Sequence, residues 1–363
     1  MNLVNLTLSG DRTQEVLLPH MKHTGEMLEM ISGGECTCYA MQDLCLPINM
    51  RRLGWGFATG SRWTLRNMKK KVVFPGMTIN VCSVDICEID GMMTIKEFKS
   101  KLNSVIGQTI NGFTLNNFSR GNHFVALTRS RTTGKYYIVV HASSNEQRKF
   151  LYPEPEAVFL DDLKKFVHPD HPERYTYYLE GEAAEQFSIV SNKLFEENVR
   201  RNSTFLQAVL GDKYTGNTLY APHYGMKTGN DWLECNIGVQ SFNPLEKRIL
   251  PLLTEPGADI YMIAPSKETT LFPHGFGSGK VDCDLTYNSD HTFTLSERIF
   301  DVTNPRIPHE RISIGKDIFV RSQFPGNNVD TCVESILSKT PGTIVDRLEQ
   351  IASSSAIGFK VHR

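Results

Sequence analysis

The sequence lacks several patterns that would assign it to a class at once. It contains no Cys-x-x-Cys pair and no His-Glu-x-x-His motif, so any metal site must be assembled from residues that are distant along the chain. No apolar stretch is as long as a membrane-spanning helix, and the first residues show no signal-peptide pattern. We therefore expect a cytoplasmic protein that does not enter the membrane, with its eight cysteines reduced.

The chain also lacks an excess of charge of either sign. Its 39 Lys and Arg residues are balanced by 40 Asp and Glu residues, which gives a formal net charge of −1. Bulk electrostatic attraction to nucleic acid or to a membrane is therefore not expected, and a phosphate-bearing partner has to be held by a local group of residues. With 363 residues, 40% of them hydrophobic, the chain is long enough to bury a large core.

Short β-type runs, separated by Gly, Pro and Asn, dominate the sequence. They cover residues 2–8, 71–74, 78–82, 92–95, 123–128, 136–141, 259–264, 312–314, 319–321 and 357–361. Apolar residues at helical spacing predict a long helix over residues 181–209 and shorter ones over 94–105 and 344–353. Because strands and helices neither alternate nor form blocks, we predict a single α+β domain over residues 1–363, with mixed or antiparallel sheets and peripheral helices.

Four histidines stand at strand ends or on turns. His123 follows a Gly-Asn pair and precedes an apolar run, while His141 ends a β-branched run. His223 and His274 each follow a proline in a turn that contains glycine. An acidic run with a cysteine precedes all four, at residues 83–90. Imidazole, carboxylate and thiolate groups are ligands of Zn²⁺ and Mn²⁺ in proteins, so this set predicts a metal centre.

The acidic run leaves a choice between Cys87 and Glu88. If this segment is extended, Asp85 and Cys87 share one face of the strand and Glu88 lies on the other. A metal-bound thiolate carries the negative charge that a bridging ligand needs, although the free thiol has a pKa of about 8.5. Together with the histidines, Asp85 and either Cys87 or Glu88 are therefore candidate metal ligands.

Taken in order, several short motifs resemble those of the RtcB family of RNA ligases, over residues 42–360. Arg-Gly-Asn-His-Phe at 120–124 resembles the family's Gly-Gly-Asn-His-Phe, and His-Ala-Ser-Ser-Asn at 141–145 resembles its His-Ser-Gly-Ser-Arg. Val-Asp-Ile-Cys at 84–87 is similar to its Val-Asp-Ile-Gly-Cys, and Pro-His-Gly-Phe-Gly at 273–277 to its His-Gly-Ala-Gly-Arg. Lys-Asp-Ile at 316–318 and Gly-Phe-Lys at 358–360 are similar to the family's Tyr-Lys-Asp-Ile and closing Lys-Gly. The motifs are short, and their joint order carries the resemblance.

The resemblance implies a GTP- and Mn²⁺-dependent enzyme with two metal ions. Its metal ligands would be Asp85, Cys87, His123, His141 and His223, with Glu88 as the alternative to Cys87. Members of the family join RNA ends that bear a 3′-phosphate or 2′,3′-cyclic phosphate to ends that bear a 5′-hydroxyl, through a guanylated histidine. His274, on its glycine turn, is the predicted covalent residue, since a neutral imidazole is a good nucleophile toward phosphorus. The predicted partners are GTP and broken RNA, with cleaved tRNA as a candidate, and the oligomeric state stays open. The nucleotide would be contacted by Asn122, His274, Lys316 and Lys360, although both lysines could equally be solvated.

Departures from the family pattern keep two other functions open. Ser278 stands where the family has an arginine, and Ala126 where it has an acidic residue. Both changes affect nucleotide-binding positions, so one alternative is an RNA-end-binding protein that has lost guanylation. The other is a metal-dependent phosphatase or cyclic phosphodiesterase. Asp43, in a segment where the family carries an additional histidine, is a candidate carboxylate for a metal or phosphate site.

Overall fold

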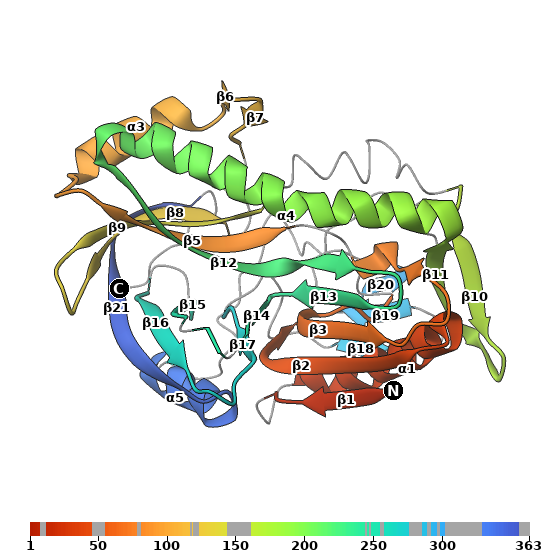
Figure 1. The fold of residues 1–363 in the computed structure, drawn as a ribbon. Helices are drawn as coiled ribbons and strands as arrows, with labels where there is room; N and C mark the ends of the chain where they lie inside the picture. The colour runs from red at the N-terminus through yellow and green to blue at the C-terminus, as the bar shows by residue number, and fades with distance from the viewer. Residues whose placement is uncertain are drawn as a thin grey trace.

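The protein is an α+β fold in which a large curled sheet is accompanied by helices (Figure 1). The structure is a computed structural model that describes residues 1–7, 12–45, 55–77, 81–116, 118, 123–143, 161–243, 245–246, 248–254, 258–275, 285–288, 292–295, 298–301 and 329–355. Within these ranges there are four α-helices, α1 (Arg12–Ser32), α3 (Ile95–Val105), α4 (Gly181–Leu210) and α5 (Val329–Lys339).

The large sheet has eleven strands, and every neighbouring pair is antiparallel except β1 and β2. Strands from both ends of the described chain belong to it. Strand β1 lies at one edge, and β21 lies between β8 and β16. In spatial order the strands are β1 (Asn2–Asn5), β2 (Glu35–Cys45), β3 (Thr59–Arg66), β13 (Leu233–Ile237), β12 (Tyr214–Thr228), β5 (Cys82–Ile89), β9 (Tyr136–Ser143), β8 (Phe124–Ser130), β21 (Gly342–Ser355), β16 (Ile260–Pro265) and β15 (Leu250–Leu252).

In the part of the chain that the structure describes, four smaller sheets accompany the large one. Two short strands, β14 (Val239–Ser241) and β17 (Leu271–Pro273), pair with each other and lead into the candidate site. The remaining small sheets are β10 (Lys164–His168), β11 (His171–Glu180) and β4 (Val72–Val73); β18 (Leu285–Tyr287), β19 (Thr292–Leu295) and β20 (Arg298–Asp301); and β6 (Thr109–Ile110) with β7 (Phe113–Thr114).

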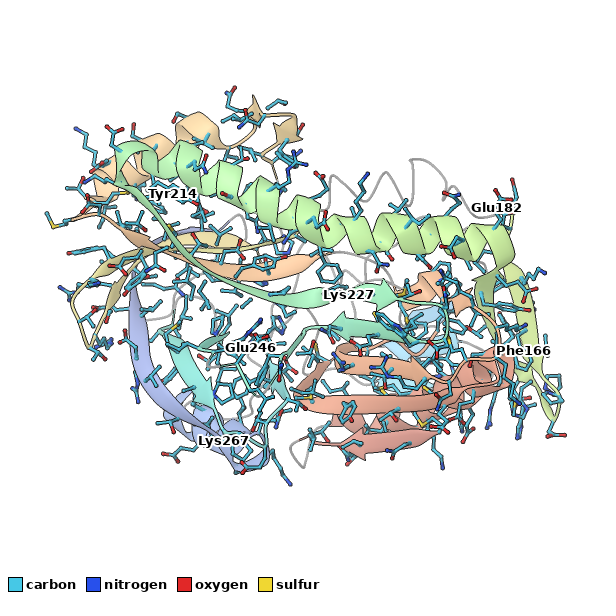
Figure 2. All side chains as sticks on the ribbon, viewed as in Figure 1. Phe166, Glu182, Tyr214, Lys227, Glu246 and Lys267 are labelled. Carbon is cyan, nitrogen blue, oxygen red and sulfur yellow. The ribbon has the colours of Figure 1, made fainter. Side chains whose placement is uncertain are left out.

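Strand alternation gives the central strands two apolar faces. On β5, Val84 and Ile86 pack into one hydrophobic cluster, whereas Cys87 packs into another that includes Phe205 and Leu206 of α4. Helix α4 runs along this second face, which we call the α4 face (Figure 1). Side chains project from the sheet on both sides (Figure 2). The face opposite α4 carries the candidate site.

Two of the three predicted helices, those over residues 94–105 and 181–209, are confirmed. The segment predicted over residues 181–209 forms α4, and its apolar stripe buries Ala184, Phe187 and Leu194. The segment predicted over 94–105 forms α3, where Thr94 caps the helix by accepting a hydrogen bond from the backbone N–H of Glu97 at 3.2 Å.

The predictions for two other segments were wrong. Residues 344–353 lie in β21 and do not form a helix, because this segment completes hydrogen-bond ladders with β8 and β16. Residues 92–95 are not a strand and lead into α3. Helices α1 and α5 were not expected. The runs at 312–314, 319–321 and 357–361, and residues 78–80 of the run at 78–82, lie outside the described residues.

No helix in the described ranges is long and apolar enough to cross a membrane. The expectation of one domain over residues 1–363 stays a prediction.

Candidate metal centre

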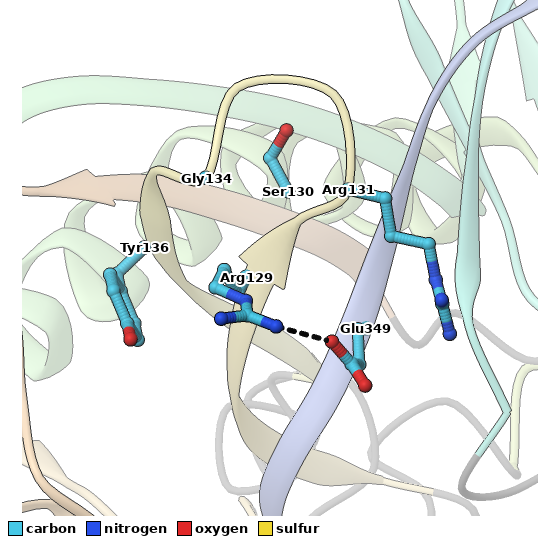
Figure 3. A pocket seen from close by; sticks show the side chains of 6 residues that line it. All are labelled: Arg129, Ser130, Arg131, Gly134, Tyr136 and Glu349. Atoms are coloured by element: carbon cyan, nitrogen blue, oxygen red, sulfur yellow. Dashed lines mark hydrogen bonds and ion pairs between the residues drawn. The ribbon is translucent and has the colours of Figure 1, made fainter.

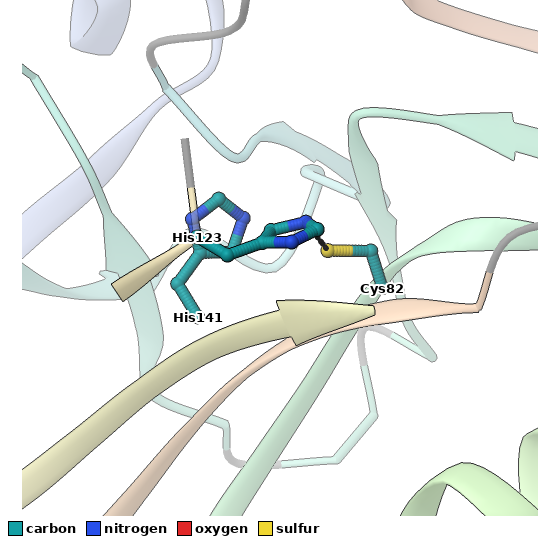
Figure 4. Close-up of side chains that lie close together, drawn as sticks. All are labelled: Cys82, His123 and His141. Atoms are coloured by element: carbon teal, nitrogen blue, oxygen red, sulfur yellow. Dashed lines mark hydrogen bonds between the residues drawn. The ribbon is translucent and has the colours of Figure 1, made fainter. Parts of the chain in front are cut away.

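Four histidines and a cysteine come together on the face of the sheet opposite α4. His141 belongs to β9 and His223 to β12, His123 precedes β8, His274 follows β17, and Cys82 begins β5. Within the described ranges, potential ligand atoms lie within 4.8 Å of one another in two groups of three. One group is Cys82, His123 and His141, and the other is His141, His223 and His274. The first group is drawn in Figure 4. His141 is common to both.

The strand register explains the direction of His141. It lies directly opposite Val84 of β5 and Phe124 of β8, and paired residues place their side chains on the same face of a sheet. Val84 and Phe124 both pack into the apolar cluster on the face opposite α4. The His141 ring therefore enters that side, where it is fully buried.

A β-bulge directs His223 to the same place. Pro222 pairs with Ser83 and Tyr224 pairs with Cys82, so His223 is the extra residue of β12 with no residue opposite it. Its Nε2 atom lies 3.3 Å from Nε2 of His141. Bulges commonly redirect a side chain beside a functional site, and this one brings an imidazole against its neighbour.

The ring of His274 is fixed through one nitrogen. Its Nδ1 lies 3.0 Å from the Gly238 carbonyl oxygen and 3.1 Å from Oδ2 of Asp43, a buried residue of β2. Because a carbonyl can only accept, Nδ1 carries a proton, and in the neutral ring Nε2 keeps its lone pair. The Gly275 N–H also donates to Asp43 Oδ2, at 3.2 Å. Burial raises the pKa of Asp43, and the hydrogen bond and charge of His274 act against this rise.

Gly275 allows the chain to turn sharply after His274. Its φ angle is +110°, and a Cβ atom there would lie 1.5 Å from the carbonyl oxygen of Leu253. A side chain at this position would therefore displace the backbone that holds His274. The His274 ring stacks on that of His223, with ring centroids 4.4 Å apart and an angle of 19° between the planes.

Burial favours the neutral forms of His123, His223 and Cys82. Desolvation, and next the charge of Arg201, lower the pKa of His123 to about 3, and burial lowers the pKa of His223 well below 6.5. Burial also raises the pKa of the Cys82 thiol, whose Sγ lies 3.6 Å from Nε2 of His123. Neutral imidazoles offer lone pairs at neutral pH, and a metal ion would deprotonate the thiol. These groups can hold a metal ion.

The structure does not bring Asp85, Cys87 or Glu88 to the histidines. Asp85 and Cys87 share a face, as strand alternation requires, but it is the α4 face. The Cys87 side chain packs in the apolar core there. Glu88 pairs with Lys135 at 2.6 Å. The cysteine that joins the histidines is Cys82, which sequence reasoning did not select, although its spacing from Val84 and Ile86 places all three on one face.

The predicted nucleotide-binding residues Asn122, Lys316 and Lys360 lie outside the described residues, as does Ser278. Ala126, at the position where the resemblance expects an acidic side chain, is fully buried in the apolar cluster of the face opposite α4.

A surface pocket of about 360 Å³ lies on the β8–β9 hairpin (Figure 3). Its two arginines are already paired, Arg129 with Glu349 at 3.2 Å and Arg131 with Asp259 at 2.7 Å. Because these charges are balanced, we assign the pocket no function. It is lined by Arg129, Ser130, Arg131, Gly134, Tyr136 and Glu349.

Comparison with models of known protein families gives no match, and a search of curated proteins gives none either.

The lowered imidazole pKa values predict that the metal-free fold weakens in acid. The unfolded chain protonates His123 near the ordinary pKa of 6.5, whereas the folded chain does so only near about 3. Below pH 6.5 the unfolded state thus binds more protons. The free energy of unfolding should fall as the pH drops toward 3, with a slope of up to about 1.4 kcal/mol per pH unit for this residue.

Denaturant unfolding across this pH range measures the effect. His123→Gln should flatten the slope, whereas His171→Gln, at the half-exposed first residue of β11, should change it much less. Equal slopes in His123→Gln and the wild type would contradict this account of the buried ring.

Proposed function

We propose that this protein is a GTP- and Mn²⁺-dependent RNA ligase of the RtcB type, which joins 3′-phosphate or 2′,3′-cyclic phosphate ends to 5′-hydroxyl ends. The observation that carries the proposal is the setting of His274. One ring nitrogen is held by Asp43 and Gly238, the other keeps its lone pair, and the ring stacks on a histidine of the candidate metal centre. A nucleophilic imidazole beside divalent ions suits phosphoryl transfer.

In the first step the Nε2 lone pair of His274 attacks the α-phosphorus of GTP. A P–N bond forms, the P–O bond to the β-phosphate breaks, and pyrophosphate leaves with the electron pair. The ring becomes cationic, and its Nδ1–H group remains hydrogen bonded to the Asp43 carboxylate and the Gly238 carbonyl. These two acceptors stabilise the positive charge that develops on the ring.

In the second step an oxygen of the RNA 3′-phosphate takes GMP from His274, which regains its neutral form. The 5′-hydroxyl of the other RNA end then attacks the activated RNA phosphorus, loses its proton, and expels GMP. A 2′,3′-cyclic phosphate must first be opened by water. The proposed partners are therefore GTP and broken RNA, with cleaved tRNA as a candidate substrate.

Four side chains are available to hold metal. Cys82, His123 and His141 would bind one ion, and His223 would be left to contact a second, because the neutral His141 imidazole has a single lone pair to offer a metal. His274 belongs geometrically to the second group, and we assign it to the nucleotide. Bound Mn²⁺ would neutralise charge on the phosphate oxygens. Asp85 and Cys87 are not included, because their side chains lie on the α4 face.

The proposal is tested by incubating the purified protein with Mn²⁺ and α-³²P-labelled GTP, and in parallel with RNA oligonucleotides that end in a 3′-phosphate and a 5′-hydroxyl. An acid-labile protein–GMP bond together with joined RNA is the expected result. Release of phosphate without protein labelling would identify a phosphatase or cyclic phosphodiesterase. RNA binding with neither activity would identify an end-binding protein.

A further inference from the structure

A buried polar cluster lies between β5 and α4, behind the metal centre. It consists of Ser83 and Asp85 of β5 with Asn198, Arg201 and Asn202 of α4, and we call it the α4 polar cluster. Each of these residues is at most 2% exposed. Arg201 is fully buried, which is rare for arginine, and a charged side chain in such a place is costly unless other groups hold it.

The contacts in the α4 polar cluster fix the Asp85 carboxylate. Nδ2 of Asn202 donates to Oδ2 of Asp85 at 2.8 Å and to the Ser83 hydroxyl oxygen at 3.0 Å. Nη1 of Arg201 donates to the amide oxygen of Asn202 at 2.9 Å, which sets the direction of that amide. The Arg201 guanidinium lies 4.1 Å from the Phe118 ring centroid, in a cation–π contact. Helix α4 thus orients the carboxylate through Asn202.

Asp85 faces away from the histidines. It pairs across the strands with Tyr220 and with Val140, and Val140 packs in the apolar cluster on the α4 face. Neither group of potential metal ligands in the described chain includes it. Asp85 is therefore separated from the ligands by the thickness of the sheet, although Cys82 is only three residues away along β5.

The strand register keeps Asp85 close to the ligands despite this separation. Val84, the residue before Asp85, lies directly opposite His141, and Ser83 lies opposite Pro222, the residue before His223. Burial raises the pKa of Asp85 itself to about 7, while hydrogen bonds from Ser83 and Asn202, and the charge of Arg201, act against this rise. Among the described residues Oδ1 of Asp85 has no hydrogen-bond partner, so these few groups support the ionised form.

We propose that Asp85 supports the metal centre from behind the sheet as a positioned negative charge and does not bind the metal itself. The inference rests on the metal centre of the proposed function. A carboxylate held behind the ligands by the thickness of one strand stabilises a divalent cation on their other side, and it offsets the repulsion from the buried Arg201 guanidinium, because little water screens charges there. Asn202 is the positioning residue that keeps the carboxylate in place. This role differs from the ligand role that the family resemblance implies for Asp85.

The test titrates the metal-free full-length protein with Co²⁺, whose thiolate charge-transfer and ligand-field absorption report the ligands directly. We expect Asp85→Asn to keep the number of bound ions and the shape of both absorption bands, and to weaken Co²⁺ binding about tenfold or more, as for other groups that support ligands from behind. Asn202→Ala should weaken binding in the same direction. The control is Glu88→Gln, an isosteric change on the same strand at a carboxylate paired with Lys135, which should bind as the wild type does.

Each result bears on the inference. Loss of one Co²⁺ equivalent, or altered ligand-field bands in Asp85→Asn, would make Asp85 a ligand and overturn it. Equal affinity in Asp85→Asn, Asn202→Ala and Glu88→Gln would also overturn it. If the wild type takes up no Co²⁺, the metal centre fails and the inference fails with it. A wild type that binds Co²⁺ but is not labelled by GTP removes the ligase proposal alone. Should Asp85→Asn not fold, Asn202→Ala provides the same comparison.

Discussion

Replacing His274 with alanine should reduce covalent labelling by GTP to background, a loss of at least about three orders of magnitude. The change removes the nitrogen that forms the P–N bond, and nothing else at this position can accept GMP. Labelling is measured with α-³²P-labelled GTP and Mn²⁺ after denaturing electrophoresis. RNA joining, measured on the same preparation, should disappear with it.

The metal content of the His274→Ala variant distinguishes a nucleophilic His274 from a metal-binding one. If His274 acts as the nucleophile, His274→Ala should retain the bound metal of the wild type, and a lost equivalent would show that the ring binds an ion instead. His171→Ala, which removes a half-exposed imidazole from the start of β11, should leave labelling unchanged. Retained labelling in His274→Ala would rule out the covalent step proposed for this residue.

Replacing Cys82 with serine should weaken metal binding about a hundredfold or more, whereas Cys87→Ser should leave it unchanged. The sulfur of Cys82 lies beside His123, and a serine hydroxyl is a poor substitute for a thiolate ligand at neutral pH. Cys87 packs in the apolar core on the α4 face. Bound metal can be measured by mass spectrometry of dialysed protein, and affinity by titration.

The paired cysteine variants control for one another, because both remove a buried thiol from the same strand. Thermal unfolding of the two metal-free variants shows whether either change simply disrupts packing. Equal metal content in both variants would show that the thiol of Cys82 is not a ligand. A loss confined to Cys87→Ser would restore the assignment made from the sequence.

Three histidines of the site, His123, His141 and His274, could be found from the sequence because each lies at or near the end of a strand. His223 was expected on a turn, but it lies within β12 at a bulge. The choice of cysteine could not be made from the sequence. Alternation along β5 correctly places Asp85 and Cys87 on one face, but it cannot say which face turns toward the histidines. That depends on the packing of α4, a long-range contact that one strand's pattern does not contain. The bulge at His223 was equally invisible, since it is defined by pairing with β5.

Similar reasons explain the errors in the secondary structure predicted from the sequence. Ile344, Leu348 and Ile351 follow helical spacing, yet the segment pairs with β8 and β16, and this tertiary pairing overrides the local pattern. Helix α1 was missed because Pro19 lies inside it and interrupts the expected pattern. Helix α4 was predicted well because its 30 residues repeat one apolar stripe many times.

The position of β21 has a consequence for the way this protein is made. Strand β8 follows His123, and its outer neighbour β21 comes from residues 342–355. During translation, β8 and β9 therefore leave the ribosome long before β21. The edge of β8 that pairs with β21 in the folded protein stays unpaired until then. An open strand edge is a template for pairing with other chains, and long-range strand pairing is slow. The nascent chain thus has a prolonged aggregation-prone stage, in which chaperones would be expected to bind it.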